Sequence, residues 1–259
     1  KSYAGKVIHE QTTYDFTNRL PDIFNIDIYK KAAVTEHIFD AAVDRSGDRE
    51  GSFSKLPNMF LPADRPMTIR YDALDPASPL INIGQGWGHF RTESALYASF
   101  ADNDKRKTQL IVSEYTNGGI TYPLDITSSS RPFSRKFIDP ARIGDASSAN
   151  SPIIRYSDIL LVYAEACGPT TDGYAAINKI RTRAGIGDLN PSLGVQAFRD
   201  AVIQERSWEL AFEGERLFDL RRTNTVEKVL VQKYGKTITS GAYFFPVPQR
   251  EIDTNPLMK

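Results

Sequence analysis

Three glutamates recur at four-residue intervals near the C-terminal end of the chain: Glu205, Glu209 and Glu213. Side chains four residues apart lie on one face of an α-helix. A pair of carboxylates can cleave a glycosidic bond, but the pair must face each other across the sugar. Carboxylates on one helix face project side by side instead. We therefore favour a structural role for these glutamates over catalysis, and we expect no catalytic residue.

The same helical face carries apolar side chains. Its members are Phe198, Ala201, Val202 and Phe212, and Arg216 falls on it as well. Charged groups amid a core face are costly unless they are paired. The pattern predicts a buried carboxylate network, answered by Arg216 and by arginines elsewhere, such as Arg155, Arg181 or Arg183.

Several classes of protein are disfavoured by composition. Lys plus Arg and Asp plus Glu number 32 each, so no basic surplus indicates a nucleic-acid partner. A single cysteine, Cys167, and three histidines (His9, His37, His89) argue against a zinc site, and we expect no metal and no cofactor. Cys167 has apolar neighbours and is interpreted as a buried, inert thiol. No apolar run approaches the ~20 residues of a membrane helix.

Four motifs in order along the chain resemble those of one family. Residues 205–222 read ERSWELAFEGERLFDLRR, which is similar to the SusD/RagB signature E-R-x-x-E-L-x-x-E-G-x-R-x-F-D-L-x-R. Residues 152–166 resemble the family's buried helix, residues 176–185 its R-x-R-A-G ending, and residues 246–256 its P-x-P-x-x-E-[IL]…N-P close. A weaker likeness, Gly86-Trp87-Gly88 with Asp104-Lys105-Arg106 downstream, extends it through the middle.

The resemblance implies a non-enzymatic, outward-facing lipoprotein of the outer membrane of Bacteroidota. Such proteins bind an oligosaccharide or peptide nutrient and serve a SusC-like, TonB-dependent transporter. Contact with the membrane would be made only through a lipid on an N-terminal cysteine, and we expect that this chain lacks the N-terminal half and that cysteine. The resemblance makes the signature residues scaffold rather than ligand contacts; they are Glu205, Arg206, Glu209, Glu213, Arg216, Asp219 and Arg221.

Ligand contacts are expected in the loop-rich segment 66–100, where exposed aromatic rings and polar side chains can hold a sugar. The candidates are Tyr71, Asn82, Gln85, Trp87, His89, Arg91 and Tyr97. Two readings remain open for Trp87, a ligand contact or a packed core residue, and His89 is read more readily as a plain loop residue. Trp208 is expected in the core.

The elements that position these residues follow from periodicity and breakers. We expect a helix at 2–10, a strand at 37–43, a polar loop at 44–52, and a helix at 92–101 capped by Thr92. Dense Pro and Gly make 57–90 irregular. From residue 154 the chain turns helical: a helix capped by Ser157 and buried all round runs to Cys167, a second covers 172–184 and ends at Gly185, and a third covers 195–221.

The expected fold is mainly α with irregular loops and short strands, SusD-like, with a tetratricopeptide-like helical hairpin. Residues 1–153 would form the loop-rich, ligand-facing region, and residues 154–259 the helical signature region. Two other functions stay open: a glycan hydrolase, which would release products, and a helical-hairpin interaction module, which would bind a protein partner without any nutrient.

Overall fold

The computed structural model of the chain describes residues 1–26, 35–46, 52–127, 131–239 and 243–258. Contacts divide it into two compact units, Lys1–Glu213 and Gly214–Lys259. It is helix-rich with short paired strands, so the predicted fold class is confirmed. Part of the predicted polar loop at 44–52, residues 47–51, lies outside the described residues. The predicted boundary at residue 153 stays a prediction.

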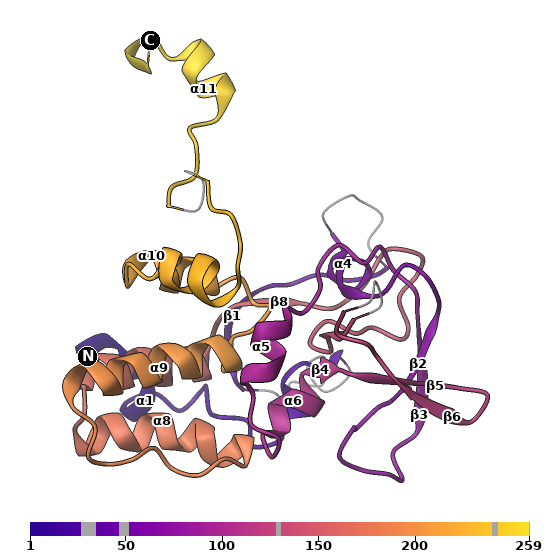
Figure 1. Cartoon of the computed structure of the whole chain (residues 1–259), viewed down its shortest axis with the longest axis horizontal. Helices are drawn as coiled ribbons and strands as arrows, with labels where there is room; N and C mark the ends of the chain where they lie inside the picture. The colour runs from indigo at the N-terminus through magenta and orange to yellow at the C-terminus, as the bar shows by residue number, and fades with distance from the viewer. Residues whose placement is uncertain (27–34, 47–51, 128–130, 240–242, 259) are drawn as a thin grey trace. The chain divides into compact units, whose positions relative to one another are not determined.

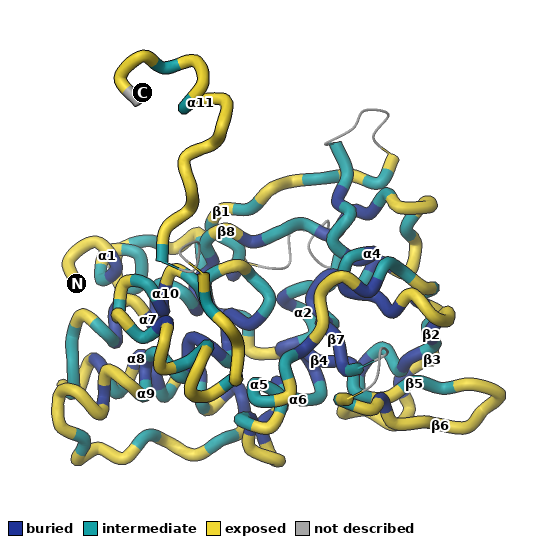
Figure 2. Tube along the Cα trace, turned by 45° about the horizontal axis from the view of Figure 1, so that its top comes forward, coloured by how far each residue is buried: buried dark blue, intermediate teal, exposed yellow. Residues whose placement is uncertain are grey.

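Four helices form the largest core of the first unit: α1 (Ser2–His9), α7 (Tyr156–Cys167), α8 (Thr171–Ala184) and α9 (Val195–Glu209). Figure 2 shows them gathered at one end of the unit. Leu161, Ile177 and Phe198 are fully buried where they meet. A short turn at Gly168, with φ of 66°, joins α7 to α8 and makes the predicted helical hairpin.

The helix ends follow local chemistry, with two corrections. Thr170 caps α8 by accepting a hydrogen bond from the Gly173 amide, and left-handed Gly185 ends it as predicted. Ser157 does not cap α7, because it lies inside the helix and donates to Glu36 instead. Thr92 does not cap the helix that follows it either; that helix, α5 (Ser94–Ser99), has no side-chain cap.

The predicted helix over 195–221 is wrong in its second half. α9 ends at Glu209, and the second unit begins before the next helix, α10 (Arg216–Arg222). Phe212 and Gly214 have φ of 71° and 93°, which no α-helix accommodates. Phe212 therefore leaves the helical face and packs edge-on against Phe60, with ring centroids 5.7 Å apart.

The prediction that helix α7 is buried all round is wrong, because Val162 on this helix is 41% exposed. Its neighbours α1, α8 and α9 cover Leu160, Leu161 and Ala164. Cys167 is only partly buried. The amphipathic packing of α7 thus depends on three helices, one of them from the N-terminal end of the chain.

The remainder of the first unit is built from short elements (Figure 1). Four antiparallel two-stranded ladders pair β1 (His37–Ala41) with β8 (Ser151–Arg155), β2 (Met67–Arg70) with β3 (Leu80–Gly84), β4 (Ile111–Val112) with β7 (Phe133–Ser134), and β5 (Glu114–Asn117) with β6 (Ile120–Pro123). The short helices are α2 (Leu20–Ile23), α4 (Leu56–Phe60), α5 and α6 (Lys105–Gln109). Met67, Ile69 and Ile83 centre a second apolar core beneath these loops.

The second unit holds α10, a π-helix η1 (Lys228–Lys233), α11 (Gln249–Thr254) and a 3-10 turn η3 (Pro256–Met258). Within it the Arg221 guanidinium lies over the Phe245 ring, 4.3 Å from its centroid. Among the described residues of the whole chain, no helix has both the length and the apolar character needed to cross a membrane.

Candidate functional site

The Trp87 loop, residues 84–91, is held by main-chain hydrogen bonds to α4 and the residues just after it. The amides of Gly86, Trp87, Gly88 and Phe90 donate to the carbonyls of Pro62, Asn58, Leu61 and Met59, at 2.8, 2.5, 2.9 and 2.9 Å. Because these bonds involve the backbone on both sides, the path of the loop is set independently of its exposed side chains.

Two glycines permit this close approach. A Cβ on Gly86 would lie 2.4 Å from the carbonyl oxygen of Asn58, far inside contact distance. Gly88 has φ of 63°, a conformation that side chains disfavour. The two glycines of the Gly-Trp-Gly sequence therefore allow the backbone to lie against α4, and the main chain that carries the Trp87 indole is held in place.

Trp87 is neither fully buried nor fully exposed, and His89 beside it is exposed. Their rings lie 5.6 Å apart between centroids and are tilted by 43°. Two neighbouring rings, one backed by the fold and one open to solvent, can stack on the apolar face of a sugar while the imidazole nitrogens hydrogen-bond to hydroxyls.

The polar candidates on this loop and on strand β3 before it are exposed. Arg91 donates through Nε to the Gly88 carbonyl at 3.1 Å, and Asn82 accepts from the Gly84 amide at 2.8 Å. The main-chain carbonyl of Gln85 accepts a hydrogen bond from Arg142, and Gln85 as a residue is exposed. The structure thus gathers Trp87, His89 and Arg91 on one short loop.

Two predicted ligand residues have different surroundings. Tyr71 lines a pocket whose walls include Ile69 and Ile81. Tyr97 belongs to α5, where the Lys107 ammonium lies 5.3 Å from its ring centroid. Trp208, expected in the core, is only partly buried and donates its indole N–H to Ser99 at 2.9 Å.

One aromatic surface escaped the sequence analysis. Tyr115 and Tyr122 are cross-strand partners in the β5–β6 hairpin, and their rings stack with centroids 5.5 Å apart. Arg65 donates to the Tyr115 hydroxyl at 2.9 Å. The Asn117-Gly118-Gly119 turn between two alternating strands is the signal that could have predicted this pairing.

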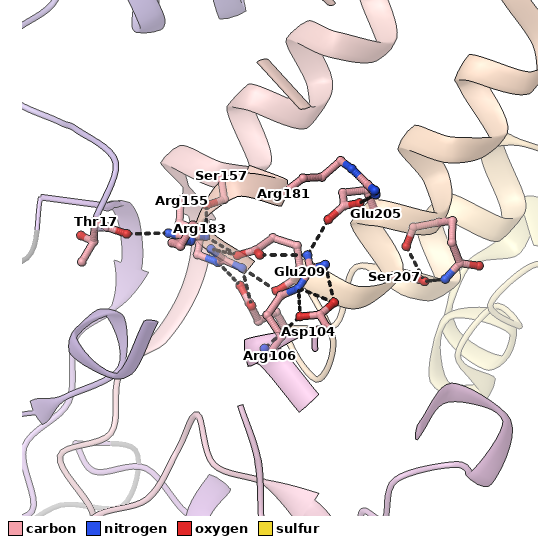
Figure 3. Close-up of polar contacts among 12 residues, drawn as sticks. Thr17, Asp104, Arg106, Arg155, Ser157, Arg181, Arg183, Glu205, Ser207 and Glu209 are labelled. Atoms are coloured by element: carbon pink, nitrogen blue, oxygen red, sulfur yellow. Dashed lines mark hydrogen bonds and ion pairs between the residues drawn. The ribbon is translucent and has the colours of Figure 1, made fainter. Parts of the chain in front are cut away.

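The glutamates on α9, Glu205 and Glu209, lie in a buried ion-pair network (Figure 3), to which Glu213 also belongs. Its acidic members are Glu36, Asp104, Glu205, Glu209 and Glu213, and its basic members are Arg106, Lys136, Arg155, Arg181 and Arg183. Arg155 alone contacts Glu36, Glu209 and Glu213 at 2.6, 2.8 and 2.7 Å. Equal numbers of buried charges of each sign offset one another.

The network's electrostatics favour the ionised form of two of its glutamates, Glu209 and Glu213. Burial alone would raise the pKa of Glu209, but the charges of Arg183, Arg155 and Arg106 hold it well below its ordinary value. The pKa of Glu213 is likewise lowered, by Arg155 and Lys136 against the effect of burial. A carboxylate that stays ionised and fully paired can neither give nor take a proton near neutral pH.

The partners of these glutamates were only partly foreseen. Arg155, Arg181 and Arg183 contact them as expected, whereas Arg106 and Lys136 were missed. Glu36, a further carboxylate that shares Arg155 and Arg183 with them, was missed as well. The remaining signature residues have other contacts: Arg206 pairs with Asp158 at 2.6 Å, and Asp219 pairs with Arg222 at 2.7 Å inside the second unit. Arg216 and Arg221 also belong to that unit.

The described residues contain no group of three or more His, Cys, Asp and Glu side chains that could hold a metal ion.

Comparison with known proteins places these features in context. The SusD family model matches residues 115–259. The "SusD-like protein P2" of Formosa agariphila is 27% identical over 198 residues, which cover 66% of this chain and 39% of that protein. "SusD-like protein P25" of the same organism is 28% identical over 61% of this chain and 31% of its own length. The chain therefore spans well under half of these relatives.

Solved structures share the fold across nearly the whole chain. Surface glycan-binding protein A from Bacteroides fluxus is 21% identical with a TM-score of 0.73, covering 98% of this chain and 54% of that one. Surface glycan-binding protein A from Bacteroides thetaiotaomicron, solved in complex with laminarihexaose, is 24% identical with a TM-score of 0.68, covering 100% and 57%. Since the family model covers more than half of its residues, this chain belongs to the SusD family.

Proposed function

We propose that this protein binds a nutrient at the bacterial cell surface, foremost an oligosaccharide and alternatively a peptide, and delivers it to a SusC-like TonB-dependent transporter. The observation that carries the proposal is the Trp87 loop, whose backbone is fixed against α4 while Trp87 and His89 remain accessible. A preorganised aromatic surface binds a ring-shaped ligand without first having to be ordered.

The class of ligand is suggested by the fold neighbours. One of them is solved with laminarihexaose, and another is described as a laminarin-binding SusD-like protein. For this chain, a neutral oligosaccharide of that kind is the first ligand to test. Trp87 would stack on a sugar ring, with His89 and Arg91 binding hydroxyls.

The proposal holds that the protein acts without catalysis. The three glutamates that first suggest hydrolysis are buried and paired with cations. We further propose an outward-facing position at the outer membrane, held there by a lipid anchor. The proposed lack of catalysis rests on the paired carboxylates and on family membership, and the proposed position at the membrane rests on family membership.

The test is a binding screen with a parallel assay for product release. Laminarihexaose, other neutral oligosaccharides and short peptides are titrated into the protein calorimetrically, and each mixture is then chromatographed. We expect saturable binding of one ligand class and no cleavage. Turnover that one Asp or Glu substitution abolishes would favour the hydrolase. Binding of a protein partner with no nutrient bound at all would favour the interaction module.

A further inference from the structure

A pocket of about 230 Å³ lies away from the Trp87 loop, beside α2 and α6. Among the residues that the structure describes, its lining carries three basic side chains, Arg19, Lys105 and Arg183, and one acidic side chain, Asp72. The formal charge of the lining is therefore positive, although the chain as a whole is neutral. A concave, positively charged surface attracts anions more strongly than the same charges on a flat one.

The one carboxylate of this pocket is already satisfied. Asp72 accepts hydrogen bonds from Arg19, from the Gln109 amide nitrogen and from the Leu74 amide. Its charge is offset by Arg19, which also pairs with Asp22 beside the pocket. Asp72 consequently neither repels an incoming anion strongly nor neutralises the other two cations.

The remaining cations differ in how they are compensated. Arg183 is buried, and it pairs with Glu36 at 2.7 Å and with Glu209 at 2.6 Å, neither of which is among the residues given above for the lining. Lys105 is exposed, and its ammonium has no carboxylate partner among the residues that the structure describes. Lys105 is therefore the group that a bound anion would neutralise directly.

Two buried side chains of the lining also have incomplete hydrogen bonding. Arg183 Nε and Gln109 Oε1 have no hydrogen-bond partner in the described part of the chain. An unsatisfied buried polar atom usually marks a place where water or a ligand completes the structure. Arg183 Nε is a hydrogen-bond donor and Gln109 Oε1 is an acceptor, and both residues line the same pocket.

A second pocket adjoins the first, since both are lined by Leu20, Pro21 and Gln109. It measures about 150 Å³, and its walls include Ile69, Ile81 and Tyr71. Charged side chains, among them Arg45, Arg135 and Asp139, also line it, and a cavity of about that size has room for a six-membered ring. A positively charged pocket that adjoins a pocket of this size suits a ligand whose ring carries an anionic substituent.

We propose that the pocket lined by Arg19, Lys105 and Arg183 binds the anionic group of an acidic sugar, a carboxylate or a sulfate ester. The adjoining pocket receives the body that carries this group, with Tyr71 in its wall. The inference rests on the proposed function, because it takes the ligand to be part of a nutrient glycan. It adds a subsite for charge to the neutral surface of the Trp87 loop.

The experiment titrates the protein with sodium glucuronate, with glucose 6-sulfate and with glucose, followed by calorimetry. Lys105→Gln removes the uncompensated charge, and Lys6→Gln is the matched control because it removes an equally exposed lysine outside the pocket. Asn18→Asp, at another exposed lining position, adds a repelling carboxylate. Lys105→Gln should weaken binding of the anion about three- to tenfold, and Lys6→Gln should not.

The outcomes separate the sources and the proposals. Lys105-dependent binding of glucuronate assigns a carboxylate, and the same result with glucose 6-sulfate assigns a sulfate ester. Binding equal to that of glucose, no binding at all, or an anion affinity that neither Lys105→Gln nor Asn18→Asp changes would overturn the inference. Laminarihexaose is titrated in parallel: if it binds while the anions do not, only the charged subsite fails. If the anions bind and no oligosaccharide does, the proposed glycan surface fails instead.

Discussion

The buried ion-pair network and the Trp87 loop use polar and aromatic groups in opposite ways. In the network, charged side chains from distant parts of the chain are almost completely removed from solvent and bind one another. In the loop, the backbone makes the internal bonds and leaves side chains such as His89 and Arg91 open. The comparison teaches that the most recognisable residues of this chain are spent on contacts inside the fold, whereas the exposed side chains that we propose for ligand binding are less distinctive in the sequence.

Breaking the network should have the largest effect. Glu209→Gln removes the carboxylate charge that Arg155 and Arg183 share, so each of these buried cations loses one of its partners. We expect the free energy of unfolding to fall by about 3–5 kcal/mol, measured by denaturant titration. The control is Asp102→Asn, which breaks an ion pair with Lys107 at a fully exposed carboxylate and should change little. Equal stability of both variants would mean that the network does not hold the fold.

Crowding the Trp87 loop should have an intermediate effect. In Gly86→Ala the new methyl would meet the Asn58 carbonyl, so the loop must move away from α4. We expect a loss of about 1–3 kcal/mol in stability together with weaker ligand binding. Gly187→Ala is the matched control, because no atom lies within 4 Å of its added Cβ. Should Gly86→Ala bind ligand as tightly as Gly187→Ala, the fixed path of the loop is irrelevant to recognition.

The buried lysine of the network predicts a smaller, pH-dependent effect. Burial lowers the pKa of Lys136 from 10.5 to about 8, despite the opposing charge of Glu213. Between these two pH values the unfolded chain holds the proton and the folded chain releases it. Raising the pH from about 8 toward 10.5 therefore favours the folded state through this group. Denaturant titrations across that range should show this rise in the wild type, relative to Lys136→Met; parallel pH profiles would contradict it.

Local periodicity predicted much of the helical scaffold. Helices α1, α7 and α8 begin and end within a residue or so of expectation, because apolar spacing marks them and Gly185 marks the end of α8. The end of α9 was missed because Leu210 to Glu213 look helical in isolation. The turn requires a positive φ at Phe212, and this conformation goes together with the packing of the Phe212 ring against Phe60, a contact that local sequence does not reveal.

The network's partners show the same limit at longer range. Sequence spacing revealed that Glu205 and Glu209 share a buried face and therefore need cations. It could not show that Arg106 supplies one, since that arginine lies 99 residues away from Glu205. Likewise, Trp87 stood out by its glycines, but only the hydrogen bonds to α4 explain why they are there.

The most direct measurement compares Trp87→Ala with the wild type in both ligand affinity and melting temperature. If the loop is a recognition surface on an independent scaffold, affinity for the bound oligosaccharide falls by tenfold or more, as about 1.4 kcal/mol of lost stacking implies. The melting temperature should change far less than in Glu209→Gln. Unchanged affinity, or a loss of stability as large as that of Glu209→Gln, would contradict the division between scaffold and binding surface.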